Sequence, residues 1–474
     1  MSGQPPSLPP LFVDLDGTLI KTDLLVESAL ALLKQQPWML LPMLGWLLRG
    51  KAHLKAQIAA RVTLESDSLP LHAQFVEYLQ AEAANGREIW LATASDARLA
   101  QPVADRVGLF RGVIASDGER NMRGSEKLKA IVAISPIFDY AGNATADYPI
   151  WEKSRKAIVV NPGSGVETGA RARGDVERVF ENRPTALRAW IKEARLYQWL
   201  KNLLIGVPLL TAHAFNAQSF VTVGVAFLAF GLVASATYMF NDLLDLPSDR
   251  RHPRKCRRPF AAGDISITSG IIVMGLLLAA GIAAACWVSP NFLLVLLGYL
   301  VVTLSYSLYF KTYMLIDVLL LAGLYTLRIM AGAVAIDVPL SSWLLAFSMF
   351  VFLSLALVKR ASELVAMEKL EREHAKGRDY GRSDLQTVIS LGASAGYLSV
   401  LVLALYVDSP YVASHYSRPH LLWLLCPFML YWISRLWMKT TRGQMHDDPI
   451  VFSLRDRGSW ASFVAMAAAV LVAM

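Results

Sequence analysis

Two acidic clusters in the chain have a spacing that suits phosphate chemistry, and the first lies close to the N-terminus. Asp14 and Asp16 are separated by one residue, directly after the apolar residues 11–13 and before a Gly-Thr pair. In such a pair one carboxylate can attack phosphorus, while the other, held protonated, supplies a proton to the leaving oxygen. Because two carboxylates would repel a phosphate, we expect Mg²⁺ at this site to offset their charge.

The other side chains that such a site needs follow along the chain in order. The hydroxyl of Thr93 can bind a phosphate oxygen, and Lys127 can neutralise phosphate charge. Asn143 and Asp147 come next, and their oxygens suit Mg²⁺. Each of these groups is of a type that a phosphate-transfer site uses.

Short apolar runs precede most of these polar residues and predict the elements that position them. Strands are expected at residues 11–13, 88–92, near 137–140 and at 157–160. Reactive groups in α/β proteins lie at the C-terminal ends of the strands. The pattern therefore predicts an α/β domain with its site at that edge of the sheet.

This succession, from D-x-D-G-T through a hydroxyl and a lysine to an acidic motif, resembles the haloacid dehalogenase (HAD) superfamily of aspartate-nucleophile phosphatases. The resemblance covers about residues 10–165 and implies a Rossmann-like domain at residues 1–165 with a helical cap at about 22–80. It implies Asp14 as the nucleophile and Asp16 as the general acid and base. It also implies that Thr93 and Lys127 bind the phosphate, and that the metal site comprises Asp14, Asp16, Asn143 and Asp147.

One position departs from the pattern of that superfamily. The last motif usually carries an aspartate where this chain has Asn143, so that Asp147 is the charged ligand there. An amide oxygen binds Mg²⁺ more weakly than a carboxylate does. Two interpretations therefore remain, an active phosphatase or a degenerate domain that serves regulation.

The composition indicates what surrounds these residues. Hydrophobic residues make up 54% of the 474-residue chain and charged residues 18%, and the mean hydropathy is +0.40. In a soluble domain about 45–50% of the residues are hydrophobic and about 25% are charged. These values exclude a disordered chain and a coiled coil and argue against a purely soluble enzyme. Three widely separated cysteines exclude a disulfide framework and a thiolate zinc site.

Beyond residue 196 the chain contains apolar runs long enough to cross a bilayer, which takes about 20 helical residues. Basic residues collect in alternate loops, so the positive-inside rule places those loops and the N-terminal domain in the cytoplasm, with the C-terminus on the opposite side. We therefore expect an integral protein of a bacterial inner membrane, and the net charge of +8 gives no support for nucleic-acid binding. The nine predicted spans are residues 197–215, 220–240, 266–288, 291–310, 313–334, 341–358, 387–407, 420–438 and 459–474.

Two shorter segments need an interpretation of their own. Residues 166–190 belong to a stretch rich in glycine and charge, without an apolar period, and are predicted to be a linker. The apolar run of residues 38–48 is too short to span a membrane. We interpret it as a core or cap helix, and the alternative is a helix that lies on the membrane surface.

The second acidic cluster follows the span predicted at residues 220–240. Asn241, Asp245 and Asp249 recur at i, i+4 and i+8, so on a helix they share one face within about 80°. Like charges at this spacing repel one another, so we expect a cation between them. A Mg²⁺ ion that also binds a substrate diphosphate would offset this repulsion. Basic residues that can bind the phosphates follow at once, namely Arg250, His252, Lys255 and Arg258.

The element N-D-x-x-D-x-x-x-D, followed by H-P-x-K-x-x-R-P, is similar to the UbiA superfamily of intramembrane prenyltransferases. The resemblance covers about residues 190–474 and implies an all-α membrane domain of about nine helices at residues 191–474. We expect transfer to depend on Asp245 above all. The resemblance implies that Mg²⁺ on the donor diphosphate is held by the acidic motif, that is by Asn241, Asp242, Asp245 and Asp249.

Most aromatic prenyltransferases of that superfamily carry a second aspartate motif between spans six and seven, which this chain lacks. Its K-R-x-x-E-L element, with Lys359, Arg360 and Glu363, resembles instead the decaprenyl-phosphate phosphoribosyltransferase branch. That branch moves phosphoribose from phosphoribosyl diphosphate onto a polyprenyl phosphate and releases diphosphate. A lipid phosphate needs cationic ligands, which Lys359 and Arg360 can provide.

Other basic residues of the membrane domain are also candidates for substrate binding. Lys201 lies in the first predicted span, Lys311 lies between the fourth and fifth, and Arg328 lies inside the fifth. An arginine within a span is costly and usually functional, although Arg328 could instead pair with an acid such as Asp317.

Three functions are compatible with these motifs. The first is a bifunctional enzyme that transfers a phosphoribosyl group to a polyprenyl phosphate and then removes the 5-phosphate, because tethering favours consecutive steps. The alternative is transfer of a polyprenyl group from its diphosphate to an aromatic or other acceptor, with an accessory or degenerate HAD domain. The third is a lipid-binding or transport protein, against which the gathering of charges at one interface argues. The expected partners are a polyprenyl lipid, a diphosphate-bearing donor and the bilayer, and the sequence is compatible with a homo-oligomer.

Overall fold

The computed structural model describes residues 8–117, 120–181, 185–369, 379–410, 412, 416–445 and 448–474, without the side chains of residues 368 and 369. The chain forms two compact units. The first combines Met1–Arg195 with Tyr238–Gly275, and the second combines Leu196–Thr237 with Leu276–Met474. Two long helices, α11 (Ala217–Leu244) and α14 (Ile267–Val288), contribute residues to both units.

A parallel sheet of six strands forms the centre of the α/β part of the first unit. Its order is β3-β2-β1-β4-β5-β6, so β1 lies between β2 and β4. Parallel neighbours need crossover connections, which here are helical, and the α/β prediction is confirmed. The strands are β1 (Leu11–Val13), β2 (Ile89–Asp96), β3 (Gly112–Ser116), β4 (Asp139–Gly142), β5 (Ala157–Val160) and β6 (Val176–Phe180).

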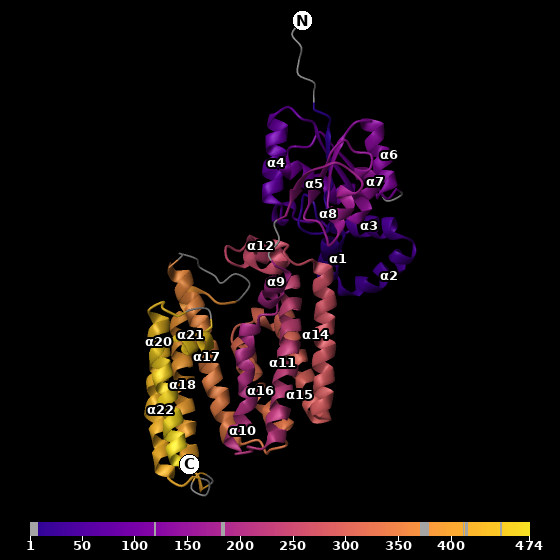
Figure 1. The fold of residues 1–474 in the computed structure, drawn as a ribbon. Helices are drawn as coiled ribbons and strands as arrows, with labels where there is room; N and C mark the ends of the chain where they lie inside the picture. Colours follow the sequence, from indigo (N-terminus) through magenta and orange to yellow (C-terminus); the bar gives the residue numbers. More distant parts are fainter. Residues whose placement is uncertain are drawn as a thin grey trace. The chain divides into compact units, whose positions relative to one another are not determined.

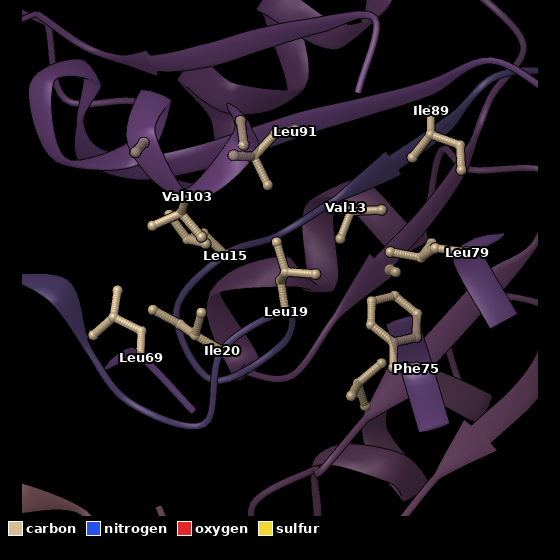
Figure 2. Packing of buried hydrophobic residues seen from close by; sticks show 14 of the residues in the cluster. Val13, Leu15, Leu19, Ile20, Leu69, Phe75, Leu79, Ile89, Leu91 and Val103 are labelled. Carbon is tan, nitrogen blue, oxygen red and sulfur yellow. The ribbon is translucent and has the colours of Figure 1, made fainter. Parts of the chain in front are cut away.

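Side chains of β1 point alternately to the two faces of the sheet, and helices lie on both sides of the sheet (Figure 1). Val13 packs in one cluster with Phe75 and Leu91 (Figure 2), whereas Phe12 packs in another with Phe138. A strand covered on both faces is apolar throughout, as β1 is. The helices that alternate with the strands are α4 (Ala73–Ala84), α5 (Ala97–Val107), α6 (Ser125–Ile134), α7 (Tyr148–Trp151) and α8 (Val166–Arg171).

A helical insertion between β1 and α4 corresponds to the predicted cap. Asp23 begins it by accepting hydrogen bonds from the main-chain N–H groups of Leu25 and Val26. Its helices share a small core that includes Leu32 and Ile58. The domain boundaries themselves stay predictions. The cap elements are α1 (Leu24–Gln35), η1 (Pro37–Met39), α2 (Leu40–Leu48), α3 (Lys51–Ala59) and η2 (Ser66–Ser68).

The prediction of a linker at residues 166–190 is wrong for most of that segment. It contains α8 and β6, and β6 pairs in parallel with β5 to complete the sheet. The sequence V-E-R-V-F of β6 mixes apolar and charged residues because an edge strand leaves part of its surface in water. Glycine and charge in the adjoining loops obscured this short strand. A further helix, α9 (Ala186–Glu193), ends the segment.

In the part of the chain that the structure describes, seven helices are long and apolar enough to cross a membrane. Within the second unit α17 packs against α16, α18 and α20, with Phe352 and Trp432 among the buried residues. The prediction of a helical membrane domain is confirmed, while its orientation stays a prediction. The seven are α11, α14, α15 (Pro290–Leu308), α16 (Ile316–Ala335), α17 (Ser342–Lys369), the segment Arg382–Val407 that ends in α18 (Leu385–Val407), and the 23-residue segment Pro419–Thr441 that ends in α20 (Leu425–Thr441).

The predicted number of nine spans is not confirmed over the described residues. The first expected span is divided into the 3-10 helix η4 (Leu196–Gly206) and α10 (Val207–Thr211), because Pro208 starts a new helix. The last, α22 (Arg457–Ala473), has 17 residues, fewer than the about 20 that a span needs. Residues 370–378 of the basic loop expected between spans six and seven lie outside the described residues. The remaining short elements are η3 (Thr145–Asp147), α12 (Leu246–Arg251), η5 (Lys255–Arg257), α13 (Pro259–Ala262), η6 (Phe310–Thr312), η7 (Arg382–Asp384), η8 (Pro419–Leu424) and α21 (Pro449–Arg455).

Candidate active sites

The first candidate site lies where three neighbouring strands end. Asp14 follows β1, Thr93 lies near the end of β2, and Asn143 follows β4. Because β1 pairs in parallel with both of the other strands, their C-terminal ends meet at the same edge of the sheet. The structure thus brings together side chains that are far apart in the sequence.

A buried lysine connects the carboxylates of this site. Lys127 Nζ lies 2.8 Å from Asp14 Oδ1 and 3.9 Å from Asp147 Oδ1. Lys127 also donates a hydrogen bond of 3.0 Å to the hydroxyl of Tyr140, which in turn donates to Asp147 over 2.9 Å. Water screens this buried ammonium group little, so its charge acts strongly on Asp14. Lys127 can therefore orient the carboxylate and neutralise a bound phosphate.

Both carboxyl groups of the D-x-D element have raised pKa values. Burial raises the pKa of Asp16 to about 7, although the hydroxyl of Ser95 and the main-chain N–H of Leu24 donate to its oxygens over 2.6 and 2.8 Å. Burial raises the pKa of Asp14 to about 6, and Lys127 opposes this rise. Asp16 is thus partly protonated near neutral pH, as a proton donor must be.

The loop that follows β4 approaches the loop that follows β1 very closely. Gly17 has a φ of +76°, and a Cβ at this position would lie 2.0 Å from Asn143 Nδ2. Asp147 accepts hydrogen bonds of 3.1 Å from the main-chain N–H groups of Asn143 and Ala144. Asp147 therefore fixes the position of Asn143, and a side chain at residue 17 would displace it.

The oxygen donors at this site suit Mg²⁺. Over the described ranges no three His, Cys, Asp or Glu side chains lie together as a metal cluster. Mg²⁺ needs only one or two protein carboxylates beside substrate oxygens and water, and Asp14 with the amide of Asn143 meets that need. Asp147 already accepts hydrogen bonds from three donors, so its assignment as a metal ligand stays a prediction.

The cap contributes a lysine that the sequence did not reveal. Lys55 on α3 donates a hydrogen bond of 2.6 Å to the carbonyl oxygen of Ala94, which follows Thr93. Burial lowers the pKa of Lys55, and the charge of Asp16 opposes this effect. A second ammonium group therefore faces the acidic pair from the cap. No motif marks it, because only the tertiary fold brings α3 to the strand ends.

The second candidate site is built around the end of α11. Hydrogen bonds of 2.9 Å run from Asp245 N to Asn241 O and from Asp249 N to Asp245 O, so the helical path continues into α12. Pro247 lies in the first turn of α12, where its missing N–H group is not needed. The three residues predicted to share a face therefore follow one helical path.

Two carboxylates near this junction converge on one cationic atom. Arg258 Nη1 lies 2.9 Å from Asp242 Oδ1 and 2.5 Å from Asp249 Oδ2. Lys255 Nζ is 3.8 Å from Asp249, and Arg195 donates to both oxygens of Asp242 over 2.6 Å. Burial raises the pKa of Asp249, and Arg258 opposes this rise. A divalent cation would fit where two carboxylates already face a single positive atom.

Glu193 is a further acid of this site that sequence reasoning missed. It ends α9, its exposed fraction is 1%, and among the described residues none donates a hydrogen bond to either of its oxygens. Burial raises the pKa of Glu193 to about 8, with a further contribution from Asp242. The side chain is therefore mostly protonated at neutral pH. In the sequence it is indistinguishable from an exposed acid on an amphipathic helix.

Two of the predicted phosphate ligands after the motif make other contacts. Arg250 Nη2 lies 2.5 Å from Glu27 Oε1, and both side chains are buried. His252 Nδ1 accepts hydrogen bonds from the main-chain N–H groups of Arg254 and Lys255. These contacts order the loop, and the assignment of Arg250 and His252 to diphosphate binding stays a prediction.

The second unit contains a separate basic cluster around Lys201. Lys201 Nζ lies 2.6 Å from Asp448 Oδ2 and 5.6 Å from the centre of the Tyr325 ring. Lys359 interacts electrostatically with both Lys201 and Asp448. Two ammonium groups beside one carboxylate leave a net positive charge, which suits a phosphate.

Asp448 was not among the predicted residues. It accepts hydrogen bonds from the main-chain N–H groups of Ile450 and Val451 and so begins α21. An aspartate before a proline signals the start of a helix, and that is how the sequence is most simply interpreted. The pairing of Asp448 with Lys201 follows from the tertiary fold.

Arg360 belongs to a buried network of acids. Its Nε lies 2.6 Å from Asp317 Oδ2 and its Nη1 lies 2.5 Å from Glu363 Oε2. Tyr380 donates to the other oxygen of Asp317 over 2.8 Å. In this arrangement two acids offset the charge of Arg360, so Lys359 is the better phosphate ligand of the two.

Arg328 lies in a network of neutral groups, and the expected alternative of a pair with Asp317 is not found. It donates to Asn202 Oδ1 over 2.9 Å and to the hydroxyl of Tyr299 over 3.1 Å. Lys311 lies apart from it, in the short η6 between α15 and α16. Whether either residue binds substrate stays a prediction.

Sequence comparisons with known proteins agree with the acidic motif of the membrane domain. The model of the UbiA prenyltransferase family matches residues 203–469. The chain is 36% identical over 471 residues to the uncharacterized protein y4nM of Sinorhizobium fredii, covering 98% of this chain and 91% of that one. It is 35% identical over 211 residues to the decaprenyl-phosphate phosphoribosyltransferase of Mycolicibacterium smegmatis, which covers 43% of this chain and 66% of the relative. A solved HAD family hydrolase of Salmonella enterica serovar Typhi covers 38% of this chain and 71% of its own, at 15% identity and a TM-score of 0.28.

Proposed function

Because the chain belongs to the UbiA prenyltransferase family, we propose that it moves a phosphoribosyl group from phosphoribosyl diphosphate onto a polyprenyl phosphate. The N-terminal domain then acts as a HAD-type phosphatase that removes the 5-phosphate from the lipid product. The observation that carries this proposal is a lysine cluster, around Lys201 and Lys359, in a chain without a second aspartate motif. The identity to a decaprenyl-phosphate phosphoribosyltransferase supports the same choice.

The acidic motif is the proposed donor site. The residues that would hold Mg²⁺ are Asn241, Asp242, Asp245 and Asp249, and the ion when bound neutralises the charge of a departing diphosphate. Arg258 and Lys255 can bind diphosphate oxygens through charge-assisted hydrogen bonds. Both cations lie beside Asp249, which supports a role for them in stabilising that charge.

The lysine cluster of the second unit is the proposed site for the acceptor phosphate. An oxygen of the lipid phosphate attacks the anomeric carbon of the ribose, the bond from that carbon to the diphosphate oxygen breaks, and diphosphate leaves. Asp448 holds Lys201 in place, so less rotational freedom is lost when the phosphate binds. Lys359 supplies the second positive charge.

The D-x-D site performs the second reaction in this proposal. Asp14 attacks the phosphorus of the 5-phosphate, an aspartyl phosphate forms, and Asp16 donates a proton to the leaving ribose oxygen. Asp16 then takes a proton from the water that hydrolyses the aspartyl phosphate, and its pKa of about 7 suits both transfers near neutral pH. Lys127 and Thr93 hold the phosphate oxygens.

Transfer of label from phosphoribosyl diphosphate tests the first reaction. The purified chain in nanodiscs, with Mg²⁺ and a polyprenyl phosphate, should produce labelled lipid, and Asp245→Asn should abolish it. Lys359→Ala should raise the KM for the lipid phosphate, whereas Lys439→Ala, a lysine in a contact with Gln444, should not. No labelled lipid, together with prenyl transfer from a prenyl diphosphate to an aromatic acid, would support the alternative function instead.

A further inference from the structure

Helix α2 of the cap, together with the preceding turn η1, exposes an apolar surface that neither proposed reaction uses. None of the nine residues of α2 is buried. The exposed fraction is 75% for Leu41, 54% for Leu44 and 90% for Leu48, and 67% for Trp38 in η1. One face of the helix carries all of its leucines, at the spacing i, i+1, i+4, i+7 and i+8, namely Leu40, Leu41, Leu44, Leu47 and Leu48.

The opposite side of the same helix is fixed to the cap. Met43 and Trp46 pack against the cap core that contains Leu32 and Ile58. The guanidinium group of Arg61 lies 4.7 Å from the centre of the Trp46 ring. The orientation of α2 on the cap is therefore determined by packing, and its leucine face points away from that core.

The charge around α2 complements an anionic lipid surface. The chain has no acidic residue between Glu27 and Glu65. Arg49 and Lys51 follow α2 directly, are exposed, and form no ion pair within the described structure. Basic residues beside an apolar helix face are typical of helices that lie in the headgroup region of a bilayer. The five basic residues of this interval are Lys34, Arg49, Lys51, Lys55 and Arg61.

We propose that α2 inserts its leucine face into the surface of an anionic bilayer, with Trp38 at the interface and Arg49 and Lys51 among the headgroups. Residues 37–48 would extend about 18 Å as a helix, which is too short to cross a hydrocarbon core of about 30 Å. Seven other helices already hold the chain in a membrane, so the bilayer is the apolar surface at highest local concentration. The lipid surface is thus a second binding partner of the cap.

This contact would favour substrates at the membrane in the phosphatase reaction. Gly50 joins α2 to α3, and α3 carries Lys55 to the carbonyl oxygen of Ala94 at the D-x-D site. A cap held at the bilayer therefore presents Asp14 and Asp16 to phosphates borne by lipids. This consequence rests on the proposed phosphatase activity, whereas the binding of α2 to lipid does not.

Lipid-borne quenchers test the insertion directly in the full chain. The natural cysteines Cys256, Cys286 and Cys426 are replaced by serine, and Leu44→Cys, or Gln80→Cys on the exposed side of α4, is labelled with an environment-sensitive fluorophore. In liposomes with anionic lipid, nitroxides on the acyl chains should quench the label at residue 44 and leave the label at residue 80 unaffected. Blue-shifted emission without quenching would mean that protein covers α2. Emission typical of a label in water would mean that α2 is exposed to solvent. Either result would overturn the proposal.

Hydrolysis of two kinds of substrate tests the consequence. The double variant Leu41→Glu with Leu44→Glu should lower the hydrolysis rate of a polyprenyl-linked ribose 5-phosphate in liposomes about tenfold, which corresponds to a loss of about 1.4 kcal/mol in the free energy of lipid binding. The hydrolysis rate of a soluble phosphomonoester should stay unchanged. Ile137→Glu, at an exposed apolar residue outside the cap, should change neither rate. Equal effects on both substrates would contradict the role in substrate selection. If the unmodified chain hydrolyses neither substrate, the phosphatase assignment fails. The quenching result alone then tests whether α2 inserts into the bilayer surface.

Discussion

Asn143 is the uncharged ligand of the proposed phosphatase metal site. It lies at the end of β4, its loop is held by Asp147, and its amide approaches Gly17 closely. We expect Asn143→Asp to lower the Mg²⁺ concentration that gives half-maximal phosphatase activity, because a carboxylate binds Mg²⁺ more tightly than an amide oxygen does. A Mg²⁺ titration of the hydrolysis rate checks this. Asn85→Asp, at an exposed position, is the control, and an unchanged Mg²⁺ dependence of Asn143→Asp would remove residue 143 from the metal site.

Glu193 gives a prediction about pH. Its pKa is raised from 4.5 to about 8, mainly by burial. Between these two pH values the folded chain binds more protons than the unfolded chain, so the stability that Glu193 contributes falls as the pH rises through that window. Glu193→Gln keeps the neutral form at every pH and should weaken this decline.

Thermal unfolding of the Mg²⁺-free protein measures the effect. The difference in Tm between about pH 5.5 and about pH 8.5 should be smaller for Glu193→Gln than for the unmodified chain. Glu181→Gln, at an exposed acid, should leave that difference as it is. Equal pH dependence in all three proteins would show that Glu193 is ionised at neutral pH.

At the scale of the elements, the packing of α16 depends on glycine. A Cβ at Gly332 would lie 2.0 Å from the carbonyl oxygen of Ile205, whereas a Cβ at Gly323 of the same helix would meet no atom within 4 Å. Gly332→Ala should destabilise the second unit by about 1–3 kcal/mol because backbone must move. Gly323→Ala should be neutral or slightly stabilising, since alanine favours a helix. Tm values of the two variants check this, and equal values would contradict the close contact.

Elements with a strong pattern could be predicted from the sequence, and those that depend on pairing could not. The buried β1, with Asp14 at its end, and the seven long apolar helices were evident from local residue type. β6 was missed because an edge strand carries little apolar signal between charged loops. The span expected at residues 197–215 was predicted from the number of apolar residues alone. Pro208, which lies in the first turn of a new helix, was not taken into account.

The candidate sites were predictable to the same extent. Motif residues such as Asp16 and Asp249 were found because their spacing is itself informative. Lys55, Glu193 and Asp448 were missed because each occurs in an ordinary helical context, and the fold alone places it beside a motif. Arg360 had the expected sequence context, and Glu363 is its i+3 neighbour on a helix, but no sequence pattern pairs Arg360 with Asp317, which offsets its charge as well.

At the scale of the whole molecule, a buried ion pair joins the cap to helix α12, which carries the end of the acidic motif, within the first unit. Glu27 on α1 accepts from Arg250 on α12 and also from the hydroxyl of Thr22 over 2.7 Å. Removing one partner leaves a buried charge unpaired, which costs about 3–5 kcal/mol. Glu27→Ala and Arg250→Ala should therefore each lower the free energy of unfolding, and the double variant should lose much less than the sum. Additive losses, measured by chemical denaturation, would show that the two side chains do not interact.

Two consecutive reactions on one lipid make the most direct prediction about this chain. With phosphoribosyl diphosphate, Mg²⁺ and a polyprenyl phosphate, mass spectrometry of the lipid products should show polyprenyl phosphate carrying an unphosphorylated ribose. Asp14→Asn should produce the same lipid with its 5-phosphate retained, at an unchanged rate of diphosphate release, because in the proposed order Asp14 acts after transfer. The same product from both proteins, or no ribosylated lipid from either, would contradict the proposed pair of activities.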